Sequence, residues 1–160
     1  MERQISSLLF EEVHYKYMFR ALQEAEKAAE AGDVPVGAII VKSGRIIGTG
    51  YNQMKSLSDA TAHAEMIAIT AAASSVQSQF LEDCTLYITL EPCVMCTGAI
   101  LLSRIPVVYF AAFDPKFGAM GSLYNIAAEG KMNFIPEIFS GIYERESSEM
   151  LKNFFSQRRN

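Results

Sequence analysis

Two cysteines stand three positions apart in the stretch "TLEPCVMC", at Cys93 and Cys96, directly after a proline and an apolar run. Two thiolates make up half of a tetrahedral zinc site, which takes its other ligands from Cys, His, carboxylate or water. The same spacing after a strand is also typical of a thioredoxin-like redox pair. The identity of any further ligand therefore decides which chemistry this pair can perform.

Three side chains are the candidates for a third metal ligand: His14, His63 and Cys84. Cys84 opens an apolar run, and we expect it to be a small buried side chain rather than a ligand. His14 begins a long helical stretch without a partner nearby in the sequence, and we expect it to be solvated. His63 lies in "TAHAE", two residues before Glu65. This histidine is the best candidate.

His63 and Glu65 occupy the start of a predicted helix, where residues i and i+2 point about 200° apart. Both can still reach one site beyond the helix N-terminus, because Cα–Cβ bonds tilt toward that end. Cys93 and Cys96 open a second predicted helix after Pro92. We therefore expect two helix N-termini to point at one site, where their positive dipole ends favour thiolates.

The hydrophobic pattern alternates between helical and strand periods along the chain. It predicts helices at residues 14–31, 61–75, 92–103 and 144–159, strands on both sides of a turn at Ser43-Gly44, and strands at 84–90 and 106–113. A Gly-rich loop at 113–122 leads into a short helical stretch. This order predicts an α/β sandwich with a mixed sheet. We expect one domain over residues 1–160, with residues 1–13 as a flexible N-terminus.

The composition is that of a globular chain with a sizeable core, because half of the 160 residues are hydrophobic. Eighteen acidic and 14 basic residues give a net charge of −4, so nucleic acid would require a local basic patch. An odd number of cysteines, three, predicts reduced thiols and a cytoplasmic location. No apolar run reaches the roughly 18 residues of a membrane span, and the N-terminus lacks signal-peptide features.

The combination of His63-Ala64-Glu65 with Pro92-Cys93-Val94-Met95-Cys96 resembles the signature of the zinc-dependent nucleobase deaminases. Five further stretches resemble the bacterial tRNA adenosine deaminases within that family: "VPVGAIIV" (34–41), "GTGYN" (48–52), "TLYITLEPCVMCTGAI" (85–100), "FDPKFGAMGSL" (113–123) and the closing "NFFSQRR". The resemblance implies a cytidine deaminase-like fold, which is a three-layer α/β/α sandwich around a mixed five-stranded sheet.

The resemblance also implies the chemistry. His63, Cys93 and Cys96 would hold one Zn²⁺ per subunit, and Glu65 would move protons between a zinc-activated water and the substrate. Hydrolysis would convert adenosine to inosine at the wobble position of a tRNA, most simply an arginine tRNA. The protein would bind the anticodon stem-loop as a homodimer. The residues implied in substrate binding are Asn52, the backbone N–H of Ala64, Asp114, Lys116 and Asn133.

The C-terminal segment combines Phe154 and Phe155 with Arg158 and Arg159, which suits contacts with single-stranded RNA. We expect at least one of the two phenylalanines to belong to the core. The chain departs from the family pattern at five positions: Ala60, where the family usually has Pro, Thr97, which replaces a common Ala, and Phe113, Pro115 and Phe117, where smaller or polar residues are frequent. The last three lie in the loop that the family uses near its substrate.

Two other functions compete with deamination of tRNA. A guanine deaminase, or another deaminase of free nucleobases or nucleosides, could use the same fold and the same metal ligands. A different class altogether is a non-catalytic zinc module that binds RNA, or a redox protein using the Cys93–Cys96 pair. The redox protein would form a disulfide and bind no zinc, and the binding module would not depend on Glu65.

Overall fold

A five-stranded mixed sheet forms the centre of the molecule in the computed structural model, which describes residues 10–132 and 134–158. The strand order is β2-β1-β3-β4-β5. The strands are β1 (Gly37–Lys42), β2 (Arg45–Tyr51), β3 (Cys84–Leu90), β4 (Val107–Ala112) and β5 (Glu137–Ser140). β1 is antiparallel to β2 and β3, whereas β3, β4 and β5 run parallel. The predicted five-stranded mixed sheet is confirmed.

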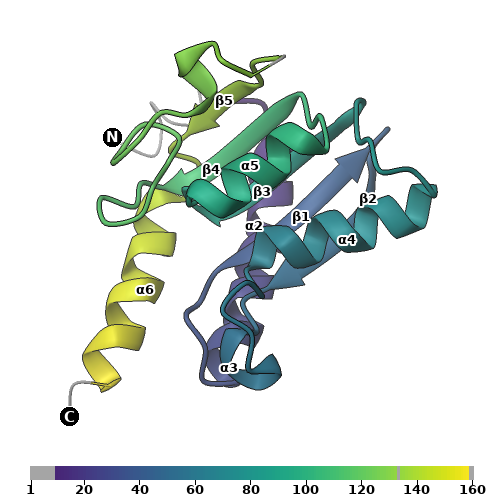
Figure 1. Ribbon diagram of the computed structural model, residues 1–160. Helices are drawn as coiled ribbons and strands as arrows, with labels where there is room; N and C mark the ends of the chain where they lie inside the picture. Colours follow the sequence, from purple (N-terminus) through teal and green to yellow (C-terminus); the bar gives the residue numbers. More distant parts are fainter. Residues whose placement is uncertain (1–9, 133, 159–160) are drawn as a thin grey trace.

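Helices cover both faces of this sheet, which gives three layers (Figure 1). α4 (Ala64–Val76) and α5 (Val94–Leu102) lie on one face, and α2 (Glu12–Glu30) lies on the other. α6 (Glu144–Arg158) packs against β3 and β4 and then extends away from the sheet. Short elements complete the chain: α3 (Met54–Leu57) and the 3₁₀ turn η1 (Ala127–Glu129). No helix in the described part of the chain is both long and apolar enough to cross a bilayer.

Local sequence explains the turns between the first elements. Gly32 ends α2 with a positive φ of 82°, a conformation that glycine adopts without strain. Ser43 and Gly44 both have positive φ, 50° and 75°, as the tightest hairpin turns require. These two features confirm the helix stop and the hairpin predicted from the sequence.

The core lies on both faces of the parallel strands, as expected for a sheet covered by helices on each side. On the α4 and α5 face, strand side chains such as Leu86, Val108 and Phe110 pack against the helices. The contact side of α4 is made of alanines, so the helix lies very close to β2. Gly48 and Gly50 are the β2 positions beneath it, and a Cβ on Gly50 would lie 2.3 Å from the Ala64 carbonyl oxygen. This close approach fixes the N-terminus of α4 against the sheet.

Several details differ from the sequence-based expectations. α3 and β5 are too short to show a periodicity in the sequence, although the resemblance implies a fifth strand. Cys84 is 1% exposed, which confirms its expected burial. The expectation for His14 is wrong, since its Nδ1 lies 2.7 Å from the Tyr87 hydroxyl and its Nε2 lies 3.2 Å from the Tyr109 hydroxyl. The reason is tertiary: α2 lies over a sheet face that carries these tyrosines.

We expect Gly50→Ala to lower the free energy of unfolding by about 1–3 kcal/mol, because the added methyl overlaps the backbone of α4. Urea denaturation would measure the change. Ser75→Ala, on the exposed side of the same helix, is the control and should stay within about 0.5 kcal/mol of the parent. Equal stability of the Gly50→Ala variant and the parent would show that α4 does not approach β2 this closely.

Candidate metal centre

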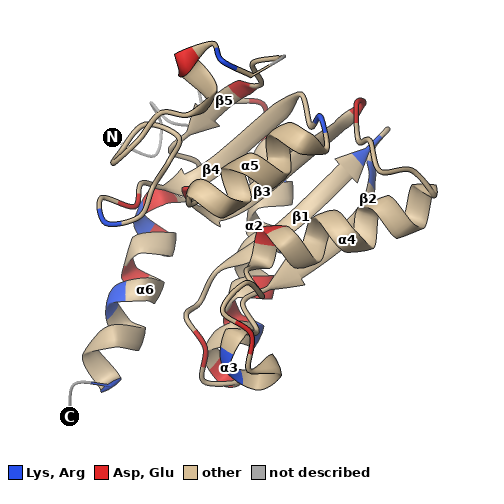
Figure 2. Ribbon diagram, in the orientation of Figure 1, with Lys and Arg blue, Asp and Glu red and all other residues tan. Residues whose placement is uncertain are grey.

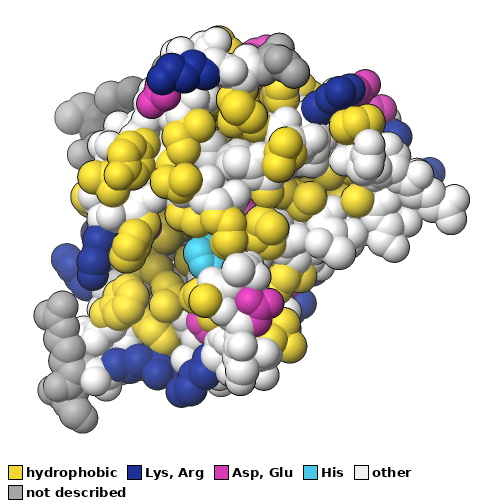
Figure 3. Space-filling model, viewed as in Figure 1, with side chains coloured by type: hydrophobic (Ala, Val, Ile, Leu, Met, Phe, Trp, Pro, Cys, Tyr) yellow, Lys and Arg dark blue, Asp and Glu magenta, His cyan; other side chains and the backbone are white. Residues whose placement is uncertain are grey.

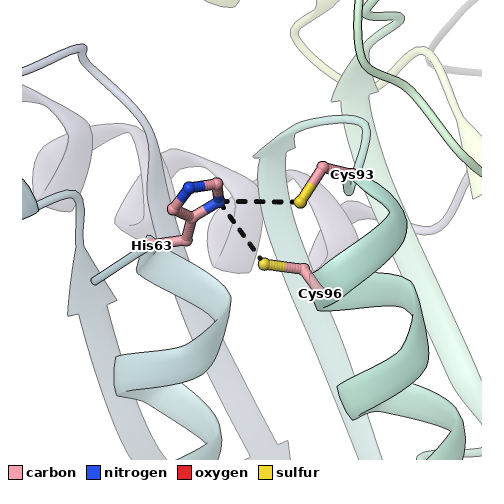
Figure 4. Close-up of side chains that lie close together, drawn as sticks. All are labelled: His63, Cys93 and Cys96. Carbon is pink, nitrogen blue, oxygen red and sulfur yellow. Dashed lines mark hydrogen bonds between the residues drawn. The ribbon is translucent and has the colours of Figure 1, made fainter. Parts of the chain in front are cut away.

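Two helices present a cysteine or histidine at the position where a capping residue normally stands. His63 is the N-cap residue of α4 and Cys93 is the N-cap residue of α5, both with extended backbone. Ser, Thr, Asp or Asn usually fills this position and bonds to the first helical N–H groups. Neither side chain makes such a bond here. Instead the two point toward one another, with Cys96 one turn into α5 beside them (Figure 4). The predicted convergence of two helix N-termini is confirmed.

The three side chains have the separations of a tetrahedral zinc site. Nδ1 of His63 lies 3.7 Å from Sγ of Cys93 and 3.6 Å from Sγ of Cys96. A tetrahedral centre with zinc–nitrogen and zinc–sulfur bonds of about 2.0–2.1 and 2.3 Å places N and S about 3.6 Å apart. One imidazole and two thiolates form a three-ligand set, which leaves a fourth position for water or substrate as in catalytic zinc sites. The donor set therefore fits zinc.

Protons compete with a metal for these ligands. A hydrogen bond between the two thiols lowers the pKa of Cys93 to about 4 and raises the pKa of Cys96 far above its ordinary value. The hydrogen bond to Cys93 also raises the pKa of His63, and a further one to the backbone of Ala60 acts in the same direction. Without a metal, the raised pKa values favour the protonated forms of Cys96 and His63. Zinc must displace these protons to bind.

Glu65 is buried next to the three ligands without being one of them. It lies in the first turn of α4 and is 4% exposed. Burial raises the pKa of its carboxyl to about 7, and charges on His63 and Cys93 also act on it. A carboxyl with a pKa near neutrality can both accept and release a proton under physiological conditions. This position therefore suits proton transfer at a water or substrate held in the open metal position.

Asn52 positions the helix that carries His63 and Glu65. It is 5% exposed, and its Oδ1 accepts a hydrogen bond from the Ala64 N–H at 2.9 Å. Its Nδ2 donates to the Val34 carbonyl at 3.1 Å, which leaves the second amide hydrogen for another acceptor. Asn52 thereby supplies the cap that His63 does not. In this structure the Ala64 N–H donates to Asn52, and its expected contact with the base or the reacting water stays a prediction.

The loop after β4 carries the other predicted substrate contacts. Asp114 is half-buried, and its Oδ1 accepts the N–H groups of Lys116 and Phe117 at 3.1 and 3.2 Å. Lys116 is exposed, with Nζ 5.6 Å from the centre of the Phe117 ring. Phe113 and Phe117 are 47% and 58% exposed. The structure does not bring these side chains into the metal cluster. Asn133 and Arg159 lie outside the described residues.

The C-terminal helix differs from its prediction. Phe155 is 46% exposed, and Phe154 is half-buried with its ring 4.4 Å beneath the Arg158 guanidinium. Neither phenylalanine belongs to the buried core, so the expectation of a core phenylalanine here is wrong. The reason is that α6 extends away from the sheet after its first turns (Figure 1). Both acidic and basic residues lie along this helix (Figure 2), which gives it no single sign of charge.

The surface above the metal ligands is hollowed and largely apolar. Figure 3 shows a histidine in the middle of the face, beside a hollow bordered by hydrophobic side chains. Lys and Arg side chains lie to the left of the hollow and below it, and Asp or Glu side chains lie below the histidine. An apolar hollow with positive charge at its rim can accept a flat aromatic base and the phosphates attached to it.

Sequence reasoning missed one buried charge in the very stretch that contains the cysteines. Glu91 is 2% exposed and accepts hydrogen bonds from the backbone N–H groups of Asp114, Met120 and Ser122. A carboxylate placed between an apolar strand and the proline before the first cysteine was a visible signal. Its partners lie more than twenty residues further along the chain, so the sequence did not identify them.

Comparison with known proteins agrees with the geometry of the centre. Residues 11–112 match the zinc-binding region of cytidine and deoxycytidylate deaminases. The chain belongs to this deaminase family. The matched region contains all three metal ligands, Glu65 and Asn52, whereas the loop after β4 and α6 lie beyond it.

Individual relatives of this deaminase are similar over nearly the whole chain. The tRNA-specific adenosine deaminase of Bacillus subtilis is 46% identical over 89% of this chain and 89% of its own length. A solved structure from a study of tRNA A34 deaminases, which edit adenosine to inosine at the wobble position, is 40% identical with a TM-score of 0.82. It covers 85% of this chain and 99% of that one. The guanine deaminase of Bacillus subtilis is 32% identical, with a TM-score of 0.60, over 91% and 93% of the two chains.

We expect zinc to bind at about one ion per chain and to bind more weakly as the pH falls, because Cys96 and His63 must lose protons. Affinity should fall on the order of tenfold per pH unit for each proton released. Competition with a chromophoric chelator between pH 8 and 6 would measure this dependence. Cys96→Ala should abolish stoichiometric binding, while the matched control Cys84→Ala should retain it. Zinc retention by Cys96→Ala, or affinity independent of pH, would contradict this ligand set.

Proposed function

We propose that this deaminase hydrolyses adenosine to inosine at the wobble position of a tRNA, most simply an arginine tRNA. The observation that carries the proposal is the similarity to the A34 deaminase structure, which spans 99% of that chain at 40% identity. The complete set of three metal ligands with a buried glutamate beside them supports a catalytic role for the site. The whole chain, residues 1–160, would act as one catalytic domain.

The chemistry assigns separate tasks to the ligands and to Glu65. Zinc, when bound by His63, Cys93 and Cys96, would supply a Lewis acid that lowers the pKa of a water to about 7. The Glu65 carboxylate accepts a proton from the water that attacks C6 of the adenine. It delivers that proton to a ring nitrogen, then accepts the second proton from the new C6 hydroxyl and passes it to the departing amino group. Adenosine and water thus become inosine and ammonia, and Glu65 returns to its starting form.

Other side chains would hold the substrate. The second amide hydrogen of Asn52 can donate to the base or its ribose. Asp114 and Lys116 lie on the loop after β4, and exposed Phe117 offers a surface for base stacking. Anticodon nucleotides are single-stranded, so their bases are available for such contacts. A net charge of −4 is compatible with this mode if the contacts are confined to one stem-loop.

The assembly and location of the protein belong to the same proposal. Val94 and Leu102 on α5 are 49% and 72% exposed, and covering these apolar side chains supports a homodimer. Each subunit would hold one zinc ion. A cytoplasmic location suits a site that needs two reduced thiolates and a tRNA substrate.

A guanine deaminase is the second candidate, because the Bacillus subtilis enzyme of that name is 32% identical over 93% of its length. The same metal ligands and Glu65 would serve that reaction. Lower identity and a lower TM-score than those of the A34 deaminase place it second. The two candidates differ in their need for RNA, which an activity assay can separate.

We expect the zinc-loaded protein to form inosine in an anticodon stem-loop with adenosine at the wobble position. Glu65→Gln should lower this rate by at least about 10²-fold while zinc remains bound, because the amide cannot carry the proton. Single-turnover assays with metal analysis would measure both. Glu82→Gln, an exposed carboxylate before β3, is the control and should keep full activity.

The other outcomes identify the competing functions. Release of ammonia from guanine but not from the stem-loop would replace the proposal by guanine deamination. RNA binding that is unaffected by Glu65→Gln, without any deamination, would indicate a non-catalytic zinc module. A Cys93–Cys96 disulfide with no bound zinc would indicate a redox protein.

A further inference from the structure

Glu91 lies at the junction between the metal helix and the loop that follows β4. It directly follows β3 and stands two residues before Cys93. Its Oε2 accepts the N–H groups of Met120 and Ser122, both at 3.0 Å, and its Oε1 accepts the Asp114 N–H at 3.1 Å. The Ser122 hydroxyl donates a further, short hydrogen bond to Oε1. One carboxylate therefore binds both ends of the segment 114–122.

The charge of Glu91 is balanced by the loop itself. Within the part of the chain that the structure describes, no Lys or Arg forms an ion pair with this carboxylate. A buried carboxylate without a cation is costly unless hydrogen-bond donors surround it. Three backbone N–H groups and one hydroxyl provide that compensation. The conformation of the loop and the burial of Glu91 therefore depend on each other.

Packing adds a second constraint at the same place. A Cβ on Gly118 would lie 2.3 Å from Oε2 of Glu91, so the loop backbone lies directly on the carboxylate. The Ala119 N–H donates to the Pro92 carbonyl at 2.8 Å, which ties the loop to the residue before Cys93. The segment 114–122 is thus wrapped around residues 91 and 92, immediately beside a metal ligand.

The loop held in this way carries exposed groups suited to RNA. Lys116 and Phe117 lie at its exposed bend, and Asp114 forms the turn that presents them. We propose that Glu91 is a positioning residue that fixes the loop 114–122 beside the metal centre, so that Lys116 and Phe117 meet the nucleotides flanking the target adenosine. The identity of this ligand rests on the proposed function. The ordering of the loop by Glu91 does not depend on the proposed function.

Substitution of Glu91 should loosen the loop 114–122 more than substitution of Ser122. Glu91→Gln keeps the shape of the side chain, but its amide NH₂ must face at least one backbone N–H that now donates to a carboxylate oxygen. Ser122→Ala removes a single hydroxyl contact and leaves the carboxylate in place. Glu82→Gln, the exposed carboxylate at the other end of β3, is the matched control for loss of charge.

Two measurements separate the positioning role from catalysis and from folding. Hydrogen exchange followed by mass spectrometry should show faster exchange in peptides covering 114–122, on the order of tenfold for Glu91→Gln and less for Ser122→Ala. Steady-state deamination of the anticodon stem-loop should show KM raised about tenfold by Glu91→Gln, with kcat changed by less than about threefold. Zinc content should equal that of the parent in every variant. Glu82→Gln should change none of these quantities.

Opposite results would overturn the inference. Unchanged exchange of 114–122 in Glu91→Gln would show that the carboxylate does not hold the loop. A fall in kcat at constant KM, or loss of zinc, would show that Glu91 acts through the metal helix instead. If Glu91→Gln does not fold, hydrogen exchange and steady-state kinetics of Ser122→Ala test the same inference. Hydrogen exchange needs no substrate, so absence of deaminase activity in the parent would refute the proposed function while leaving the effect on the loop measurable.

Discussion

The structure depends on the convergence of two helix N-termini on one point. His63 and Cys93 stand at N-cap positions, and their side chains face each other instead of capping their own helices. Each helix lacks the hydrogen bond between an N-cap side chain and its first N–H groups. In its place the two helices form a metal site where the positive ends of both helix dipoles meet. This exchange is stable only if α4 and α5 are held rigidly side by side on the sheet.

Much of the remaining architecture supplies that rigidity. Glycines in β2 and alanines in α4 allow a very close contact between helix and strand, and Asn52 caps the N-terminus of α4 from outside the helix. On the other side, Glu91 and Pro92 connect the start of α5 to the loop after β4. Polar groups that look unrelated in the sequence thus serve one purpose. Asn52 positions the ligand-bearing end of α4, and Glu91 holds the loop after β4 beside the ligand-bearing end of α5.

Two buried carboxylates near the site behave differently because their surroundings differ. Glu65 is buried beside the metal ligands, and burial raises the pKa of its carboxyl to about 7. Glu91 is surrounded by backbone N–H groups that complement its negative charge. A carboxyl that can exchange protons suits acid–base chemistry, whereas a carboxylate saturated with donors suits a structural task. Burial alone would not have separated these roles.

The sequence by itself determined the chemistry of the site: the ligand types, the Cys-x-x-Cys spacing, the glutamate two residues after the histidine, and the helices and strands long enough to show periodicity. These features are local, and their physical causes act over a few residues. The tertiary structure alone decided which distant groups meet. It placed His14 among tyrosines, directed the Ala64 N–H to Asn52, left Phe155 exposed on α6, and brought the loop 114–122 onto Glu91. Such contacts join residues from 12 to 95 positions apart, and they depend on how the layers pack, which no local pattern encodes.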